Sequence, residues 1–262
     1  MNDDTSLPGR VAIVTGGTSG IGSATCIGLA AVGAHVVAVG RDSHRLEGVL
    51  AAARRQAQHG ARVVGLCLDM RDERDADAMA LHALDAFGRI DVLVTAAGRL
   101  RGIDGAARKV HDMTLADWDE VIRTNLTGVF LSCRAVLPAM IEQNRGDIIN
   151  ISSTSGLEGL AYDGAYCASK FGVAGFSEAL AEEVERFGVR VHVIFPGAVD
   201  TPMWRTGDLI PHLGPALPVN RVVDAIRLVS ELPRDVRIDG FIVEPLDAVT
   251  LAASLTSVSA GP

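Results

Sequence analysis

Short, nearly continuous apolar runs alternate with longer amphipathic stretches along almost the whole chain, and this alternation restricts the fold more than any other feature. Seven runs rich in Val and Ile predict buried strands, the last of them weaker than the rest: 10–15, 35–40, 62–68, 90–95, 147–152, 189–195 and 240–244. Helical patterns lie at about 20–32, 42–59, 71–87, 114–143, 166–187 and 217–232. Apolar runs without polar alternation are typical of parallel strands covered on both faces. The sequence therefore predicts an α/β fold with a doubly wound parallel sheet and helices on both sides.

The organisation of the 262 residues favours a single domain, 1–262. No shift in composition, internal repeat or Ser/Pro-rich linker divides the chain, and its length suits one large domain. The predicted core covers residues 7–245. Residues 196–218 lack clear periodicity and contain several Pro and Gly, so we expect a substrate loop there. Residues 246–262 are expected to form a C-terminal tail, either loose or packed on a neighbouring subunit.

Composition excludes several function classes. The formal net charge of −8 argues against a protein that grips nucleic acid or an anionic membrane. No apolar run approaches the ~20 residues of a membrane helix, and the polar, acidic start lacks the pattern of a secretory signal. The cysteines are widely spaced, which favours a reduced, structural role: Cys26, Cys67, Cys133 and Cys167. The histidines show no ligand spacing, so we predict no metal site. The cysteine pattern together with the missing signal and membrane segments predicts a cytoplasmic location.

The first predicted strand runs directly into the glycine-rich sequence TGGTSGIG at 15–22, which opens a helix. Glycines at such a turn let the backbone approach a pyrophosphate and aim helix N-terminal N–H groups at it. The alternative is a tight structural turn without a ligand, because glycine spacing alone is a weak signal. Its position between a strand and a helix favours a Rossmann-like dinucleotide site. The expected contacts are Gly16, Thr18, Ser19, Gly20, Ile21 and Gly22.

The end of the second strand carries Gly40 and Arg41 where an adenosine ribose would lie. A carboxylate at this place would accept hydrogen bonds from the 2′-hydroxyl of NAD, whereas an arginine accommodates the 2′-phosphate of NADP. Arginine can bind a phosphate through two charge-assisted hydrogen bonds. The sequence therefore predicts NADP(H), with NAD(H) as the alternative in which Arg41 is simply solvated beside Asp42.

Tyr166 and Lys170 form the most specific pair in the sequence. The chain contains only two tyrosines and two lysines, yet one of each stands four residues apart in a helical pattern, on one face. A phenol has an ordinary pKa near 10, and a nearby cation favours its ionised form. The pair therefore predicts a tyrosine acid–base catalyst whose pKa is lowered by lysine. The alternative is a structural tyrosine beside a lysine that reaches solvent.

Ser153 ends the fifth predicted strand, thirteen residues before Tyr166. A hydroxyl at the carboxyl end of a strand points into the crevice where open α/β sheets bind ligands. We predict that Ser153 binds the substrate, with Ser152, Thr154 and Ser155 as rival candidates.

Taken together, these motifs resemble the short-chain dehydrogenase/reductase (SDR) family in its single-domain branch of roughly 250 residues. The resemblance covers about 7–245 and includes TGGTSGIG, Asp69, the NLTG run at 125–128, ISS at 151–153, YCASK at 166–170 and PGAVDTP at 196–202. It implies a catalytic tetrad of Asn125, Ser153, Tyr166 and Lys170. It further implies that Asn125 anchors a water and that Lys170 holds the nicotinamide ribose. The residues implied to lie on either side of the nicotinamide are Pro196, Gly197, Val199 and Thr201. The other implied cofactor contacts are Asp69, Met70, Ala97 and Gly98.

The sequence departs from the family pattern at Ala96, where the family usually has an Asn that braces the sheet. This departure puts the local stability and the geometry of the cofactor loop in doubt. The basic segment 99–109 is slightly long for the family and is expected to be a surface loop at the rim of the cleft.

The predicted reaction is the interconversion of a ketone and a secondary alcohol by hydride transfer, with Tyr166 handling the proton. An apolar, cyclic or 3-oxo substrate is expected from the apolar residues of the 196–218 loop. The candidate substrate contacts are Ser153, Ser155, Tyr162 and Trp204. A non-catalytic cofactor sensor is the alternative from another functional class. A third alternative, methyl transfer from S-adenosylmethionine, is disfavoured because that reaction does not need the Tyr–Lys pair. A homotetramer or homodimer is implied by the resemblance alone.

Overall fold

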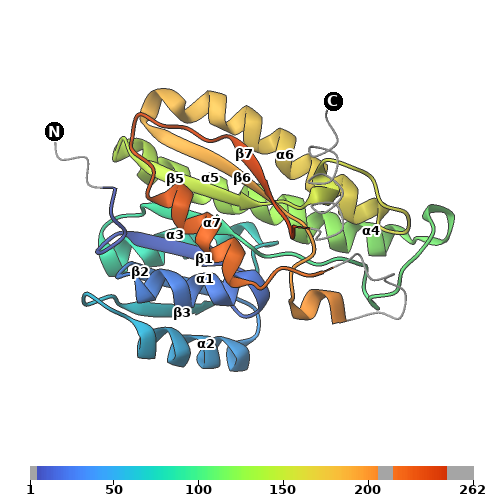
Figure 1. Ribbon diagram of the computed structural model, residues 1–262, viewed down its shortest axis with the longest axis horizontal. Helices are drawn as coiled ribbons and strands as arrows, with labels where there is room; N and C mark the ends of the chain where they lie inside the picture. Colours follow the sequence, from blue (N-terminus) through green and yellow to red (C-terminus); the bar gives the residue numbers. More distant parts are fainter. Residues whose placement is uncertain (1–4, 206–214, 247–262) are drawn as a thin grey trace, which may run out of the picture.

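All seven predicted strands pair in one parallel sheet. The computed structural model describes residues 5–205 and 215–246 (Figure 1), and within them the strand order is β3-β2-β1-β4-β5-β6-β7. The strands are β1 (Val11–Thr15), β2 (His35–Gly40), β3 (Val63–Cys67), β4 (Val92–Thr95), β5 (Gly146–Ile151), β6 (Val189–Pro196) and β7 (Gly240–Val243). The expected doubly wound parallel sheet is confirmed. Its order reverses between β1 and β4, and this switch point is where open α/β sheets bind ligands.

Helices cover both faces of the sheet, as Figure 1 shows. One face carries α1 (Gly20–Ala31), α2 (Ser43–Gln56) and α7 (Asn220–Ser230); the other carries α3 (Glu73–Phe87), α5 (Gly128–Glu142) and α6 (Gly164–Val184), with α4 (Leu115–Ile122) packed on α6. Successive residues of β1 show why two helical layers are needed. Ala12 and Val14 belong to the apolar core under α1, whereas Ile13 belongs to the core under α3 and α5. A strand that is apolar on both faces requires a helix on each.

The single helix expected at 114–143 is instead interrupted by a π-helical turn, Arg123–Thr127, between α4 and α5. Such turns are rare and occur frequently at functional sites. This one places Asn125, whose side chain is fully buried, against α6. The continuous stretch Leu115–Glu142 is also the one described helical segment long and apolar enough to cross a membrane. It packs against β4, β5 and α6 in this fold, which is the position of a core helix.

A buried carboxylate joins β5 to three arginines at the end of the sheet opposite the strand C-termini. Asp147, with no exposed surface, accepts hydrogen bonds from Arg10 at 2.5 Å, Arg190 at 2.7 Å and Arg234 at 3.1 Å. Burial alone would raise the pKa of Asp147, but the hydrogen bond from Arg190 and the three positive charges lower it overall. The amino ends of β1, β5 and β6 are thereby tied together.

We expect Asp147→Asn to lower the free energy of unfolding by about 3–5 kcal/mol, because it leaves buried guanidinium groups without their counter-ion. The pKa of Asp147 is below its ordinary value of 3.8 in the folded protein, so its contribution is present above that pH and is lost as the pH falls. Urea titrations at pH 7 and at about pH 2.5, below that ordinary value, measure both effects. Asp112→Asn, at an exposed carboxylate, is the control. A variant as stable as the wild type would contradict the assignment.

Candidate active site

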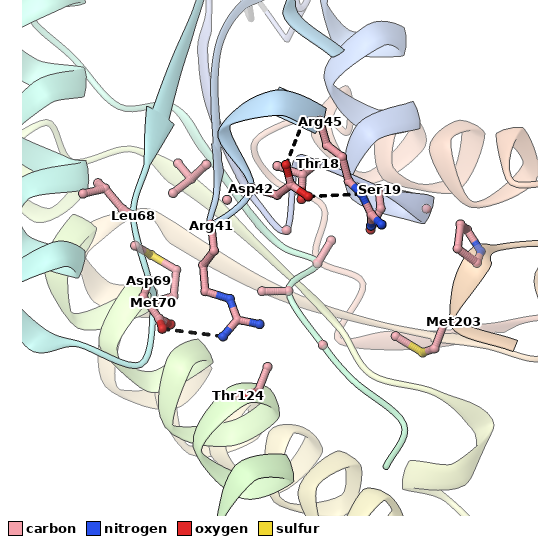
Figure 2. A pocket seen from close by; sticks show the side chains of 18 of the residues that line it. Thr18, Ser19, Arg41, Asp42, Arg45, Leu68, Asp69, Met70, Thr124 and Met203 are labelled. Carbon is pink, nitrogen blue, oxygen red and sulfur yellow. Dashed lines mark hydrogen bonds and ion pairs between the residues drawn. The ribbon is translucent and has the colours of Figure 1, made fainter. Parts of the chain in front are cut away.

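A large cleft lies at the carboxyl ends of β1, β2, β3 and β4, at the topological switch point. Its volume is about 550 Å³, a size suited to an organic cofactor. Thr18 and Ser19 approach it from the turn before α1, and Thr124 and Met203 lie on its opposite wall (Figure 2). The predicted cofactor contacts that line this cleft are Gly16, Thr18, Ser19, Gly20, Arg41, Asp69, Met70, Ala97, Gly98 and Thr201.

Two glycines allow the turn between β1 and α1 to close against its neighbours. Gly16 has φ +68°, and a Cβ there would lie 2.6 Å from the carbonyl oxygen of Ala96 at the end of β4. A Cβ on Gly22 would lie 2.2 Å from the carbonyl oxygen of Gly16. Neither distance is sterically allowed. Gly22 is absent from the cleft wall, so in this structure it supports the turn from behind.

Arg41 lies beside an acidic residue at the adenosine end of the cleft. Its guanidinium is 3.6 Å from the Asp69 carboxylate, toward which it points in Figure 2, and its side chain is half exposed. Arg71 also binds Asp69, at 2.6 Å, and continues to Glu120. Burial raises the pKa of Asp69, but the hydrogen bonds and charge of Arg71 outweigh it and lower that pKa overall. Asp69 is therefore ionised and holds Arg41 at the cleft wall.

A second cavity, beside the large cleft, brings the catalytic candidates together. Ser153, at the end of β5, and Tyr166 and Lys170, one helical turn apart on α6, all line it. Other residues also line it: Ile21, Ile151, Pro196, Gly197, Val199 and Ser152, which was a rival candidate to Ser153. Ala96, Gly98, Thr201 and Met203 line both this cavity and the large cleft, so the two are continuous. The sequence separates these groups by up to 182 positions, and the parallel sheet unites them.

The Tyr166–Lys170 pair differs in one respect from the prediction. Burial raises the pKa of Tyr166 to about 12, against a lowering effect of its hydrogen bond with Ser153. Burial also lowers the pKa of Lys170 to about 8. The ammonium lies 5.6 Å from the Tyr166 ring centre and donates to the carbonyl oxygen of Ile151 at 2.8 Å. In the protein alone, desolvation outweighs the hydrogen bond with Ser153, and the tyrosine is a neutral phenol at pH 7.

Asn125 braces the site through its side chain. Its amide donates to the carbonyl oxygen of Arg99 at 2.9 Å and to the Ser169 hydroxyl at 3.0 Å, and its oxygen accepts from the backbone N–H of Arg99 at 2.8 Å. The π turn, the segment after β4 and α6 are thus joined at one buried amide. That the residue also anchors a catalytic water stays a prediction.

The remaining predicted substrate contacts lie at different places. Ser155 is buried and donates its backbone N–H to the Ser153 hydroxyl at 3.2 Å, so it orients Ser153 and does not line the cavity. Tyr162 is 55% exposed, with φ +70°, in the turn before α6. The backbone of Trp204 belongs to the short helix Pro202–Arg205, but its side chain lies outside the described residues. The middle of the predicted 196–218 loop and the tail beyond Leu246 are outside them as well.

Another hydrogen bond braces the sheet where Ala96 replaces the family's usual Asn. The Thr95 hydroxyl donates to the Asn150 oxygen at 2.7 Å, and the Asn150 amide donates to Ser177 at 2.8 Å. These three side chains connect β4, β5 and α6 in the core. The doubt raised by Ala96 is answered by this neighbouring polar chain.

Sequence reasoning missed several residues of the site. Asp42, Arg45, Leu68, Arg71, Thr124 and Pro202 also line the large cleft, whereas Met203, which lines it too, was expected in the apolar wall of the substrate loop. Their places after strands β2 and β3 and near the π turn are the only signal that could have found them. No group of three His, Cys, Asp or Glu side chains able to hold a metal occurs within 5–205 and 215–246.

The model of the short chain dehydrogenase family matches residues 10–208, which is more than half of the chain. The chain belongs to this family. As a short-chain dehydrogenase it is an oxidoreductase, and the expected resemblance is confirmed. It is 44% identical over 201 residues to a monensin polyketide synthase putative ketoacyl reductase from Streptomyces virginiae, covering 76% of this chain and 74% of the relative. It is 40% identical over 200 residues to D-threitol dehydrogenase from Mycolicibacterium smegmatis, covering 76% and 74%.

Solved structures agree with the fold of this short-chain dehydrogenase. A metagenomic short-chain oxidoreductase in complex with NADP is 34% identical, with a TM-score of 0.78 over 92% of this chain and 99% of that one. Levodione reductase is 30% identical, with a TM-score of 0.81 over 94% and 99%. The relatives differ in substrate, so they indicate the reaction class and not one substrate.

We expect Lys170→Met to unfold at a higher temperature than the wild type at pH 7, because it removes a buried cation. The pKa of Lys170 is lowered to about 8 in the folded protein. Between that pH and its ordinary value of 10.5 the unfolded chain binds more protons, so the wild type gains stability as the pH rises. The difference between the two melting temperatures should therefore shrink from pH 7 to pH 10. A constant difference would show that Lys170 is not shifted.

Proposed function

We propose that this protein is an NADP(H)-dependent oxidoreductase that interconverts a ketone and a secondary alcohol, with Tyr166 as the acid–base catalyst. The observation that carries the proposal is the continuity of the two cavities. A dinucleotide whose adenosine end lies at Arg41 and whose pyrophosphate lies at the N-terminus of α1 would extend to Tyr166. Such a cofactor supplies the hydride that the carbonyl carbon accepts.

The residues of this chain supply the proton and the position of the oxygen. Ser153 and Tyr166 are hydrogen-bonded to each other, so their hydroxyls lie side by side, and a carbonyl oxygen that replaced this bond would accept from both. Burial keeps Tyr166 protonated at neutral pH, which suits a general acid that donates to the developing alkoxide. The ammonium of Lys170 adds a positive charge close to the phenol, and that charge stabilises the phenolate left after proton transfer. These properties favour the direction of ketone reduction.

NADP(H) is favoured over NAD(H) by the charge at the end of β2. Gly40 offers no carboxylate to the ribose, and Arg41 lies half exposed at the cleft. The relative solved with NADP shares the fold over most of the chain. NAD(H) remains the alternative, because Arg41 is already paired with Asp69.

The location, the domain organisation and the oligomeric state are also proposed, on indirect support. The free cysteines Cys26, Cys67, Cys133 and Cys167 suit a reduced, cytoplasmic location, and the common sheet of all described strands suits one domain. Large apolar side chains stay exposed on α4, α5 and α6: Leu115, Trp118, Phe130 and Phe171. These helices are the face that we propose for a homodimer or homotetramer.

We expect Tyr166→Phe to lower kcat for ketone reduction by about 100-fold or more, because it removes the proton donor. The Kd for NADPH should stay within about twofold, which shows that the site is intact. Initial rates of NADPH oxidation with a panel of ketones, and fluorescence titration of NADPH, give the two values. Activity near the wild-type level would refute the mechanism. A wild type that binds NADPH but turns over no ketone would favour a cofactor sensor instead.

We expect Arg41→Met to weaken NADPH binding by about tenfold or more, which is the loss of one charge-assisted phosphate contact. NADH has no 2′-phosphate, so its Kd should change little. Arg74→Met, at an exposed position on α3, is the matched control. Equal effects on the two cofactors would mean that Arg41 does not bind the 2′-phosphate.

A further inference from the structure

Arg101 is buried beside the catalytic helix, although the sequence predicts a surface loop at 99–109. Its relative exposure is 8%, and that of Leu100 is 6%. The side chain of Arg99 holds this part of the loop in place, because its guanidinium donates to the carbonyl oxygens of Arg101 at 2.7 Å and Gly102 at 2.5 Å. The expectation of a plain surface loop is therefore wrong at its first residues. A buried arginine is costly unless something binds its charge.

Asp163 faces Arg101 from the N-terminus of α6. It occupies the N-cap position but makes no capping hydrogen bond with its side chain. Its Oδ1 atom lies 3.5 Å from Nε of Arg101, and the two side chains are 12% and 7% exposed. Nε of Arg101 and Oδ1 of Asp163 are both buried without a hydrogen-bond partner among the described residues. The ions attract each other, yet one donor and one acceptor stay unused.

A small cavity adjoins this pair and the catalytic tyrosine. Arg101 and Asp163 line it together with Tyr162, Tyr166 and Met113. The space in it that a water-sized group can occupy is about 10 Å³, which is close to the minimum for one oxygen atom with its hydrogen. Tyr166 also lines the catalytic cavity, so a substrate held at its hydroxyl could place a second group here.

The other ion pair of this cavity is already satisfied. Arg108 lies 3.5 Å from Asp117 and donates to Asp104 at 2.8 Å. Asp117 accepts from the Thr114 hydroxyl at 2.7 Å and from the backbone N–H of Ile103 at 2.9 Å. Among the described residues that line this cavity, the buried side-chain atoms without a hydrogen-bond partner are therefore Nε of Arg101 and Oδ1 of Asp163.

An unused donor next to an unused acceptor matches a hydroxyl group. Its oxygen can accept from Nε of Arg101 while its hydrogen is donated to Oδ1 of Asp163, each at about 2.8 Å. A hydrocarbon would leave both atoms unsatisfied, which is unfavourable for buried polar groups. A carboxylate would satisfy the arginine but would be repelled by the aspartate. We infer that Arg101 and Asp163 form a specificity subsite for a hydroxyl group of the substrate, and that the substrate class is hydroxyketones and the corresponding diols.

This inference rests on the proposed ketone–alcohol reaction and refines its substrate. The carbonyl end is held by Ser153 and Tyr166, whereas the far end carries a hydroxyl and not only the apolar group expected from the sequence. Arg101 and Asp163 do not touch the reacting atoms. They determine which substrates bind.

The test compares ω-hydroxy-2-alkanones of four to seven carbons with 2-alkanones of the same length and with the methyl ethers of the hydroxyketones. Isothermal titration into the wild-type enzyme with bound NADP⁺ gives the Kd of each ketone without turnover, so the result does not depend on activity. At least one hydroxyketone should bind tenfold or more tightly than its 2-alkanone and its ether. Equal Kd values for all three, at every length, would overturn the inference.

Substitutions locate the effect. Arg101→Met and Asp163→Ala should each abolish the preference for the hydroxyketone and leave the Kd of the 2-alkanone within about twofold. Melting temperatures show whether Arg101→Met folds. If it does not, Arg101→Lys, which keeps the positive charge, takes its place in the comparison. Arg186→Met, at an exposed arginine after α6, should keep the full preference. A preference that survives both Asp163→Ala and Arg101→Lys would overturn the subsite.

Reduction rates separate the inference from the proposed function. Wild-type reduction of both ketone series with equal kcat/KM and equal Kd leaves the proposed function standing and refutes the subsite. Tighter binding of the hydroxyketone without any NADPH oxidation supports the subsite and refutes the proposed function.

Discussion

Parallel pairing of all the described strands is the constraint on which the site depends. In such a sheet every strand ends at the same edge, so the turn after β1, the ends of β2 and β3, and the segments after β4 and β5 must meet there. Gly16 shows how tight this meeting is, since a single added carbon would collide with the end of β4. The opposite edge is held by Asp147 and its three arginines. One end of the sheet is thus tied by charge, and the other is left free for ligands.

Burial accounts for the chemical character of the candidate catalytic groups. It keeps Tyr166 protonated and makes Lys170 easier to deprotonate. In the protein alone the pair is therefore a neutral phenol beside an ammonium group that loses its proton more readily than usual. Burial also explains why Arg101 and Asp163 point to a ligand. Buried charged groups are normally fully hydrogen-bonded, and these two are not. Hydrogen bonds from Asn125 hold the loop that carries Arg101 against α6. Asn125 therefore positions both the candidate proton-transfer site and the proposed hydroxyl subsite.

Much of the architecture could be predicted because it follows from local patterns. Strand runs without polar alternation, a glycine-rich turn between a strand and a helix, and a Tyr–Lys pair one helical turn apart are all visible within short windows. What could not be predicted depends on contacts between distant segments. The π turn at Asn125 lies inside a continuous helical pattern, and the burial of Arg101 depends on Arg99 and α6 folding over it. The pKa of Tyr166 was expected to fall and instead rises, because desolvation is a property of the packed core.

By itself the sequence determined the alternation of strands and helices, and it pointed to a glycine-rich turn and a Tyr–Lys pair as the candidate cofactor and acid–base sites, since each of these patterns lies in residues close together along the chain. The tertiary structure decided the strand order and the continuity of the two cavities. It also decided the partners of Asp147, Arg41 and Asn125, and the pairing of Arg101 with Asp163. These features join residues that lie tens of positions apart, and only the packed sheet brings their atoms within hydrogen-bonding or ion-pair distance. For that reason the reaction class could be predicted from the sequence, whereas the proposed substrate class comes from the fold.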